Sequence, residues 1–220
     1  VRTLGRVNNK VLAQLLHKIA DMNIKARMTK VTTPSGTDIT FEVDPTHKVS
    51  CDAGEAHEPG MFMLPGQINV VPKFGSINGT LVFDGSLVPP CGLLEQPIVM
   101  KIEDGIIKDI SGGKQAVQFK KWLESFKDEK MFKVAHLAYG LNPGAKLCGD
   151  IVEDERVWGC TEWGIGYVSP IDAKPGINAK SHCDGICLNA SVWLDDTKIL
   201  ENGNYIYMEL KELENKLFSE

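Results

Sequence analysis

The sequence predicts an α+β fold, with a large, mainly antiparallel β-sheet and two or three covering helices. Two observations lead to this prediction. Short β-branched segments separated by turn residues recur along most of the 220 residues, whereas two stretches repeat apolar residues at helical spacing. Strands that follow one another along the chain, without a helix between each pair, are typical of the α+β class.

The two helical stretches are well separated in the sequence. The first predicted helix covers residues 8–23, with asparagines that serve as its N-cap and its stop. Its apolar stripe consists of Val11, Leu12, Leu15, Leu16, Ile19 and Met22. The second predicted helix covers residues 115–132, and its apolar side consists of Val117, Trp122, Leu123 and Phe126.

Turn residues divide the rest of the chain into strands. Tight turns are predicted at Pro34-Ser35-Gly36, Asn78-Gly79, Asp84-Gly85 and Asp104-Gly105. The first closes a hairpin over residues 25–44, and the last closes one over residues 99–113. From residue 133 to residue 213 the pattern predicts short strands joined by glycine-rich connections.

Composition argues against several classes of protein. The formal net charge is −5 and the chain has no basic stripe, so nucleic acid is not an expected partner. The apolar runs are shorter than the roughly 20 residues that span a bilayer, so no membrane role is expected. The six scattered cysteines and the lack of a signal peptide predict reduced thiols in a cytoplasmic protein. A small-molecule ligand fits this composition, and a homo-oligomer remains open.

The sequence begins with Val1 rather than Met, which suggests that it starts inside a longer polypeptide. We therefore expect residues 1–23 to form an N-terminal helix that links to a missing N-terminal domain. Residues 24–220 are expected to form an α+β metal-binding domain of catalytic type.

The stretch AKSHCDGICLNASVWLDD offers a pair of metal ligands. His182 and Asp184 stand one residue apart in a predicted strand. Residues i and i+2 of a strand share a face, so the imidazole and the carboxylate would point into the same cleft. Cys183, between them, would point the other way. The pair suits two neighbouring ligands of a divalent metal ion.

Two other apolar segments each contain one residue of the same kind, His136 in VAHLAYGLNPGA and Glu162 in GCTEWGIG. A histidine in such a segment is also explained as a satisfied core residue, but a buried carboxylate is costly unless it is paired, hydrogen-bonded or bound to metal. Two histidines and one carboxylate form the ligand set of non-haem Fe(II) oxygenases, and zinc hydrolases use similar ligands. The residue types therefore leave oxygen chemistry and hydrolysis both open.

A set of ordered motifs resembles one superfamily. These motifs are VTTPSGTDITFEV, LPGQINVVP, GSINGTLVFDGS, LAYGLNPGAK, EDERVWGCTEWGIG and SHCDGICLNASVWLDD. The superfamily joins the thermophilic metalloaminopeptidases (aminopeptidases T and S) to the 2,5-dihydroxypyridine 5,6-dioxygenases. The resemblance covers residues 27–204.

The dioxygenase branch of this superfamily implies metal ligands at His136, His182 and Asp184. Glu162 departs from the patterns of both branches, and is a candidate for a further ligand or an acid/base group. His57, in a glycine-flanked loop, is a second candidate for proton transfer. The resemblance implies Fe(II) as cofactor, with Zn(II), Co(II) or Mn(II) as alternatives. It also implies ring cleavage of a hydroxylated heteroaromatic small molecule.

The aminopeptidase branch implies glutamates at the positions of Gln67 and His136 and a histidine at Glu162, so only His182 and Asp184 agree with it. Gln67 has no charge with which to hold two dications together. A metalloaminopeptidase resembling leucyl aminopeptidase and acting on short peptides is therefore the second expectation. An inactive divergent module is the third.

Overall fold

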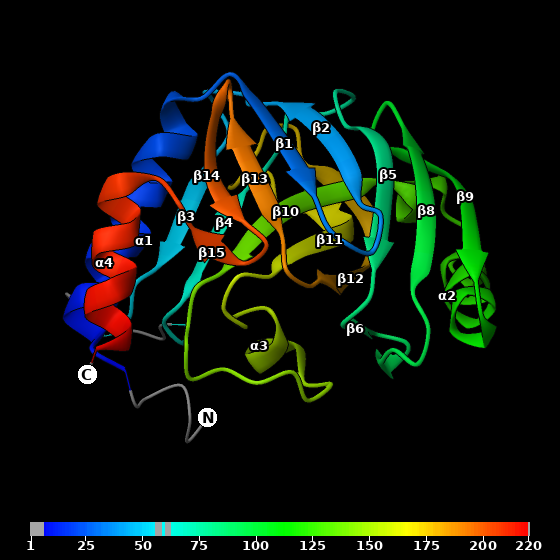
Figure 1. The fold of residues 1–220 in the computed structure, drawn as a ribbon. Coiled ribbons are helices and arrows are strands. Elements are labelled where there is room, and N and C mark those ends of the chain that lie inside the picture. Colours follow the sequence, from blue (N-terminus) through cyan, green and yellow to red (C-terminus); the bar gives the residue numbers. More distant parts are fainter. Residues whose placement is uncertain (1–6, 56–58, 60–62, 220) are drawn as a thin grey trace.

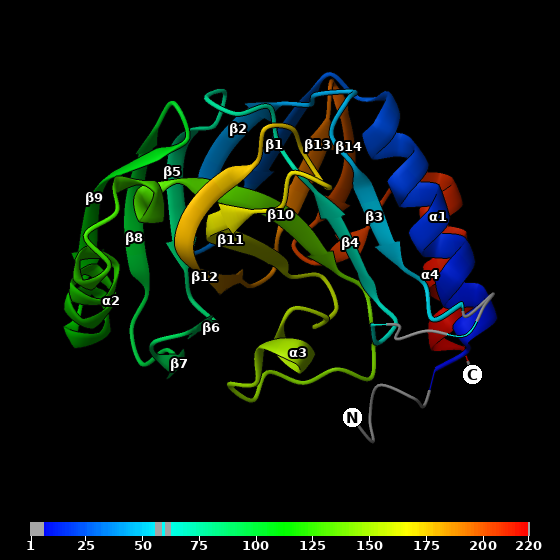
Figure 2. The same ribbon diagram turned by 180° about the vertical axis from the view of Figure 1, so that it is seen from behind.

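The computed structural model describes residues 7–55, 59 and 63–219. Within them the strands form two antiparallel sheets, one in front in Figure 1 and the other in front in Figure 2. The eight-stranded sheet has the order β15 (Asn204–Tyr205), β14 (Thr197–Glu201), β13 (Ser191–Leu194), β1 (Met28–Thr32), β2 (Asp38–Glu42), β5 (Asn78–Phe83), β8 (Ile98–Glu103) and β9 (Ile106–Gly112). The seven-stranded sheet has the order β3 (Val49–Asp52), β4 (Gln67–Val70), β10 (Val134–Gly140), β11 (Thr161–Val168), β12 (Ile177–Cys187), β6 (Ser86–Val88) and β7 (Gly92–Leu93).

Within the described residues, four helices and one 3-10 turn accompany the two sheets. They are α1 (Asn9–Lys25), α2 (Lys114–Ser125), the 3-10 turn η1 (Glu129–Phe132), the single-turn α3 (Ile151–Asp154) and α4 (Met208–Phe218). Helices α1 and α4 lie side by side at one edge and α2 lies at the other (Figures 1 and 2). The predicted α+β class is confirmed, although the strands divide into two sheets instead of one.

The hydrophobic core fills the space between the two sheets. Phe41 of β2 meets Trp163 of β11 edge to face, with ring centroids 6.0 Å apart. Leu12 and Leu16 of α1 are fully buried in the same core. Because successive strand residues point to opposite faces, the neighbours of each core residue lie on the outer face of its sheet.

The two predicted hairpins are confirmed. Strand β1 pairs with β2, and β8 pairs with β9. The turn expected at Asn78-Gly79 is wrong, because both residues belong to β5. The Cβ of any side chain at Gly79 would lie 2.2 Å from the carbonyl oxygen of Asp38 on the neighbouring strand, so this glycine permits close strand pairing.

The first helix begins at its predicted cap, since the Asn8 side chain accepts a hydrogen bond from the Val11 N–H. It ends two residues later than expected, at Lys25. Asn23 does not stop it but lies buried, donating to the carbonyl of Ile19 and accepting from the Tyr139 hydroxyl.

The second helix is shorter than predicted. It ends at Ser125, because Lys127 adopts a positive φ of 49° and the Asp128 side chain then caps a separate turn at Lys130. Val117 is 54% exposed, so it does not belong to the buried side. The prediction of a strand through residue 213 is also wrong, because α4 occupies Met208–Phe218.

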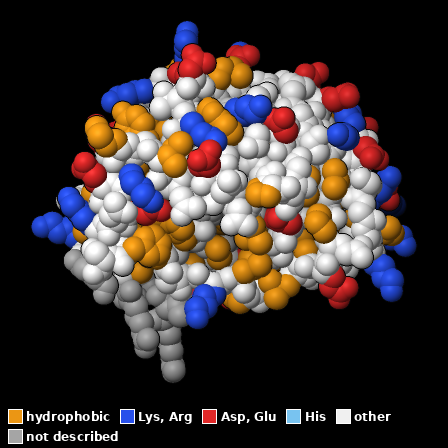
Figure 3. Space-filling model, viewed as in Figure 1, with side chains coloured by type: hydrophobic (Ala, Val, Ile, Leu, Met, Phe, Trp, Pro, Cys, Tyr) orange, Lys and Arg blue, Asp and Glu red, His pale blue; other side chains and the backbone are white. Residues whose placement is uncertain are grey.

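None of the helices in the described residues is both long and apolar enough to cross a membrane. On the face shown in Figure 3, basic and acidic side chains are interspersed with small apolar areas.

Candidate metal centre

The outer face of the seven-stranded sheet carries the predicted site. Trp163 and Cys183 point into the core, so Glu162 and Gly164 on β11 and the neighbours of Cys183 on β12 face outward. Cys183 thus points away from the site, as the sequence predicted.

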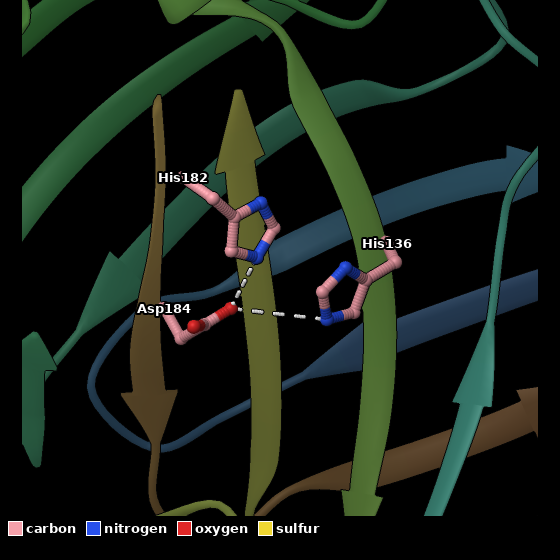
Figure 4. A group of neighbouring side chains, drawn as sticks. All are labelled: His136, His182 and Asp184. Carbon is pink, nitrogen blue, oxygen red and sulfur yellow. Dashed lines mark hydrogen bonds and ion pairs between the residues drawn. The ribbon is translucent and has the colours of Figure 1, made fainter. Parts of the chain in front are cut away.

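Strand register brings the site residues together. On β10, His136 lies opposite Gly164 of β11, and Gly164 in turn lies opposite Asp184 of β12. His182 lies opposite Gly166, two residues beyond Gly164 on β11. Three strands from the later half of the chain therefore place two imidazoles and a carboxylate next to one another (Figure 4).

These three side chains converge. One ligand atom from each of His136, His182 and Asp184 lies within 4.8 Å of the others. Nε2 of His182 is 2.7 Å from Oδ1 of Asp184, and Nε2 of His136 is 3.8 Å from the same oxygen. The two imidazoles are stacked, with centroids 5.2 Å apart and planes inclined by 9° (Figure 4). This donor set could hold one divalent metal ion.

Gly164 makes this stacking possible. A Cβ at this position would lie 2.4 Å from Cε1 of His136 and 2.7 Å from Cε1 of His182. Any side chain would therefore push the imidazoles off the sheet. Gly164 lies inside a strand, so the two imidazoles, rather than a turn, leave no room for a side chain at this position.

A backbone carbonyl fixes the orientation of the His182 ring. Its Nδ1 lies 2.9 Å from the carbonyl oxygen of Tyr167, and a ring nitrogen that faces a carbonyl carries the proton. The other ring nitrogen, Nε2, is then the one directed at Asp184. Metal-binding histidines in proteins usually have such a partner on the other ring nitrogen.

Glu162 is the fourth member of the cluster. It is fully buried, and its Oε2 lies 3.0 Å from Nε2 of His136. It also shares a hydrogen bond with Asp184. Its Oε1 is buried without a hydrogen-bond partner among the described residues. An orphaned buried carboxyl oxygen is unusual in a folded protein, and a bound cation or a proton would satisfy it.

The environment shifts the pKa values of the two carboxyl groups in opposite directions. Burial, followed by the charge of Asp184, raises the pKa of Glu162 well above its ordinary value. Burial also acts on Asp184, but the hydrogen bond and charge of His182 outweigh it and lower the pKa of that carboxyl. Burial lowers the pKa of His136. Without a metal ion the cluster therefore favours a protonated Glu162 beside an ionised Asp184 and a neutral His136.

A cavity of about 420 Å³ opens directly onto the two histidines. It is large enough for one substituted aromatic ring. Its lining residues are Lys48, Ser50, Asn69, Val71, His136, Tyr167, Val168, Ser169, Asp172 and His182.

A second polar cluster adjoins the site, and sequence reasoning missed it. Arg156 is fully buried; its Nε donates to the carbonyl of Leu64 at 2.8 Å, and its guanidinium pairs with Glu155 and Asp52. Glu155 shares a hydrogen bond with Gln67. Burial raises the pKa values of Glu155 and Asp52, and the charge of Arg156 opposes this rise. In the sequence, EDER has the composition of an exposed helix, so only the tertiary structure reveals this burial.

The structure thus brings His136, Glu162, His182 and Asp184 together. Gln67 lies at the edge of this region, 4% exposed. His57 lies outside the described residues.

Fold and donor set define an α+β protein with a two-histidine, two-carboxyl cluster on the outer face of a sheet. The profile of the NicX family, 2,5-dihydroxypyridine 5,6-dioxygenase, matches residues 6–207. The chain belongs to this family, which confirms the superfamily that the motifs indicated.

Individual relatives agree. The 2,5-dihydroxypyridine 5,6-dioxygenase of Pseudomonas putida KT2440 is 26% identical over 196 residues, which cover 84% of this chain and 56% of that protein. The solved structure of 2,5-dihydroxypyridine dioxygenase from the same organism has a TM-score of 0.79 at 21% identity, covering 92% of this chain and 64% of that one. AmpT from Thermus thermophilus has a TM-score of 0.70 at 16% identity, covering 90% of this chain and 55% of that one. The two structures share the fold, and the chain spans between about half and two thirds of the length of these relatives.

Proposed function

We propose that this chain forms the metal-binding catalytic part of a non-haem Fe(II) dioxygenase that opens the ring of a hydroxylated N-heteroaromatic small molecule. The observation that carries the proposal is the convergence of His136, His182 and Asp184 beside a cavity of ring size. Membership of the dioxygenase family supports the same reaction.

In this proposal His136, His182 and Asp184 would hold the metal ion, and the substrate would bind in the adjoining cavity. Fe(II) bound there supplies the one-electron chemistry that lets an aromatic ring react with O2. Zn(II), Co(II) or Mn(II) could bind to the same donors, but these ions would be less suited to that one-electron chemistry.

The protein's own contribution is to orient ligands and to handle protons. The Tyr167 carbonyl holds His182 with Nε2 toward the site, and the ionised Asp184 supplies negative charge. We assign Glu162 to proton transfer. A bound metal ion would favour its ionised form, and Oε1, which has no partner among the described residues, could then take up the proton that a ring hydroxyl releases. Its Oε2 is close enough to His136 Nε2 for Glu162 to act as a fourth ligand instead.

The donor set also supports oxygen chemistry over peptide hydrolysis. Gln67 occupies the position where the aminopeptidase pattern implies a glutamate, and it is hydrogen-bonded to Glu155. A neutral amide adds no charge with which to hold a second dication.

The test is oxygen uptake by the Fe(II)-loaded chain with 2,5-dihydroxypyridine, followed together with the loss of the ring's ultraviolet absorbance. We expect the two signals to change in equal amounts, and His182→Ala to abolish both. No oxygen uptake, together with metal-dependent hydrolysis of aminoacyl-nitroanilides in Zn(II) or Co(II), would replace the dioxygenase with a peptidase.

A further inference from the structure

The wall of the cavity next to the histidines carries two polar side chains that the protein itself does not use. Asn69 of β4 and Ser50 of β3 lie directly opposite each other in the sheet. Both line the cavity with His136 and His182. Neither side chain has a hydrogen bond or an ion pair with another described residue. Strand residues that face a cavity with unused donors and acceptors are suited to binding a ligand.

Register places Asn69 at a suitable distance from the metal cluster. Ala138 of β10 lies opposite both Asn69 and Glu162. Asn69 is thus on the strand next to His136, one diagonal step away. Diagonal neighbours on adjacent strands are roughly 7–8 Å apart, a gap that one aromatic ring with its substituents can fill. Ala138, which lies between them in the sheet, carries only a methyl group.

Three other polar residues of the cavity, Lys48, Asp172 and Ser169, are already engaged. Lys48 and Asp172 pair with each other, Nζ to Oδ1 at 3.6 Å, and the Lys48 N–H donates to the Asp172 carbonyl at 2.7 Å. The Ser169 hydroxyl oxygen accepts from the Ile171 N–H. Among the cavity side chains without a partner in the described residues, Asn69 is the one that offers a donor and an acceptor on two separate atoms.

A carboxamide presents one N–H donor beside one C=O acceptor, a pattern that matches a planar ring edge with the same pair reversed. A 2-hydroxypyridine in water exists largely as its 2-pyridone tautomer, whose edge carries an N–H next to a C=O. Asn69 can bond both groups at once, as asparagine does with the edge of adenine. A benzene ring with the same hydroxyl groups offers no ring N–H.

We propose that Asn69 is a specificity-determining residue that recognises the lactam edge of a 2-pyridone substrate, with Ser50 as an adjacent hydrogen-bonding group. This deepens the proposed function, on which the position of the ring beside the metal cluster depends.

Binding, measured without turnover, tests this inference separately from the reaction. Isothermal titration calorimetry under anaerobic conditions would compare 2,5-dihydroxypyridine with hydroquinone, which has the same hydroxyl pattern but no ring nitrogen. We expect the chain to prefer the pyridine. Asn69→Leu, which keeps the side-chain volume, should lower affinity for the pyridine roughly tenfold or more and leave hydroquinone within about threefold.

Asn69→Asp keeps the acceptor and loses the donor, so it should give an intermediate loss for the pyridine. Asn204→Leu makes the same chemical change at an exposed position of the other sheet and serves as the control. Thermal unfolding of each variant verifies that it is folded.

Equal losses for both ligands in Asn69→Leu, or equal affinity of the unmodified chain for both, would overturn the inference. If oxygen-dependent ring opening fails while the Asn69-dependent preference persists, the inference holds and the proposed reaction falls. If ring opening succeeds without that preference, only the inference falls.

Discussion

At the scale of single residues, the site depends on two that no metal-ligand pattern contains. Gly164 has no side chain, and this lets the His136 and His182 rings stack across β11. Glu162, on the same strand, fills the remaining space with a carboxyl group whose Oε1 has no partner among the residues described. A glycine and an acid two residues apart thus set the shape and the charge of the cluster.

Glu162 should make the metal-free protein less stable as pH rises. Burial raises its pKa in the fold above the 4.5 expected in the unfolded chain. Above that pH the carboxyl group loses its proton in the unfolded state first, so the free energy of the unfolded state falls relative to that of the fold. Glu162→Gln, which mimics the protonated acid, should be more stable than the unmodified chain, with a difference that opens above about pH 4.5 and widens toward neutral pH.

Urea unfolding of both metal-free proteins at several pH values measures this difference. A constant difference from pH 4 to pH 8 would show that Glu162 ionises as readily in the fold as in the unfolded chain. The same variant should bind Fe(II) more weakly if Glu162 is a ligand, and equally well with slower turnover if it only holds a proton.

At the scale of elements, the local hairpins were predictable and the pairing between distant strands was not. The turn at Asp104-Gly105 is encoded in consecutive residues, so β8 and β9 follow from sequence alone. The register of β10, β11 and β12 joins residues far apart in the chain, and a one-residue shift would turn His136 into the core. Alternation on β12 predicted that His182 and Asp184 share a face. The apolar segments around His136 and Glu162 marked both as candidates, and the family resemblance then assigned His136 as the third ligand.

The C-terminal helix was wrongly predicted as part of a strand. Leu210, Leu213 and Leu217 have helical spacing, and Leu210 and Leu217 are buried. The preceding aromatic segment, Tyr205 to Tyr207, has strand composition and was extended too far. A boundary between a strand and a helix without a glycine or proline has little local signal.

Arg156 should be essential for joining α3 to the seven-stranded sheet. Its guanidinium donates to the Val152 carbonyl at 2.7 Å and pairs with Asp52 at 3.4 Å, and it also contacts Glu155. Arg156→Leu would leave two partly buried carboxyl groups without their buried cation, so we expect the free energy of unfolding to fall by about 3 kcal/mol.

Chemical denaturation measures this loss. Lys198→Leu, which breaks a pair with the exposed Glu201, is the control and should change stability far less. A loss for Arg156→Leu no larger than that of the control would mean that the cluster is solvated and does not hold α3 in place.

At the scale of the whole molecule, the candidate site combines early and late parts of the chain. Strands β3 and β4 supply Ser50 and Asn69, whereas β10, β11 and β12 supply the metal cluster. The antiparallel order β3-β4-β10-β11-β12 places them on one continuous face. The composition of the chain argued against some partners but could not predict this face, because the face exists only once the two sheets have packed.

The central claim is that His136, His182 and Asp184 hold one metal ion. Its most direct test is the iron content of the chain after anaerobic loading with Fe(II) and gel filtration. We expect one iron per chain in the unmodified protein and in the control His17→Ala, which alters an exposed histidine outside the cluster. His182→Ala should retain almost none, because one of the proposed ligands is removed. Equal iron in His182→Ala and the unmodified protein would contradict the account.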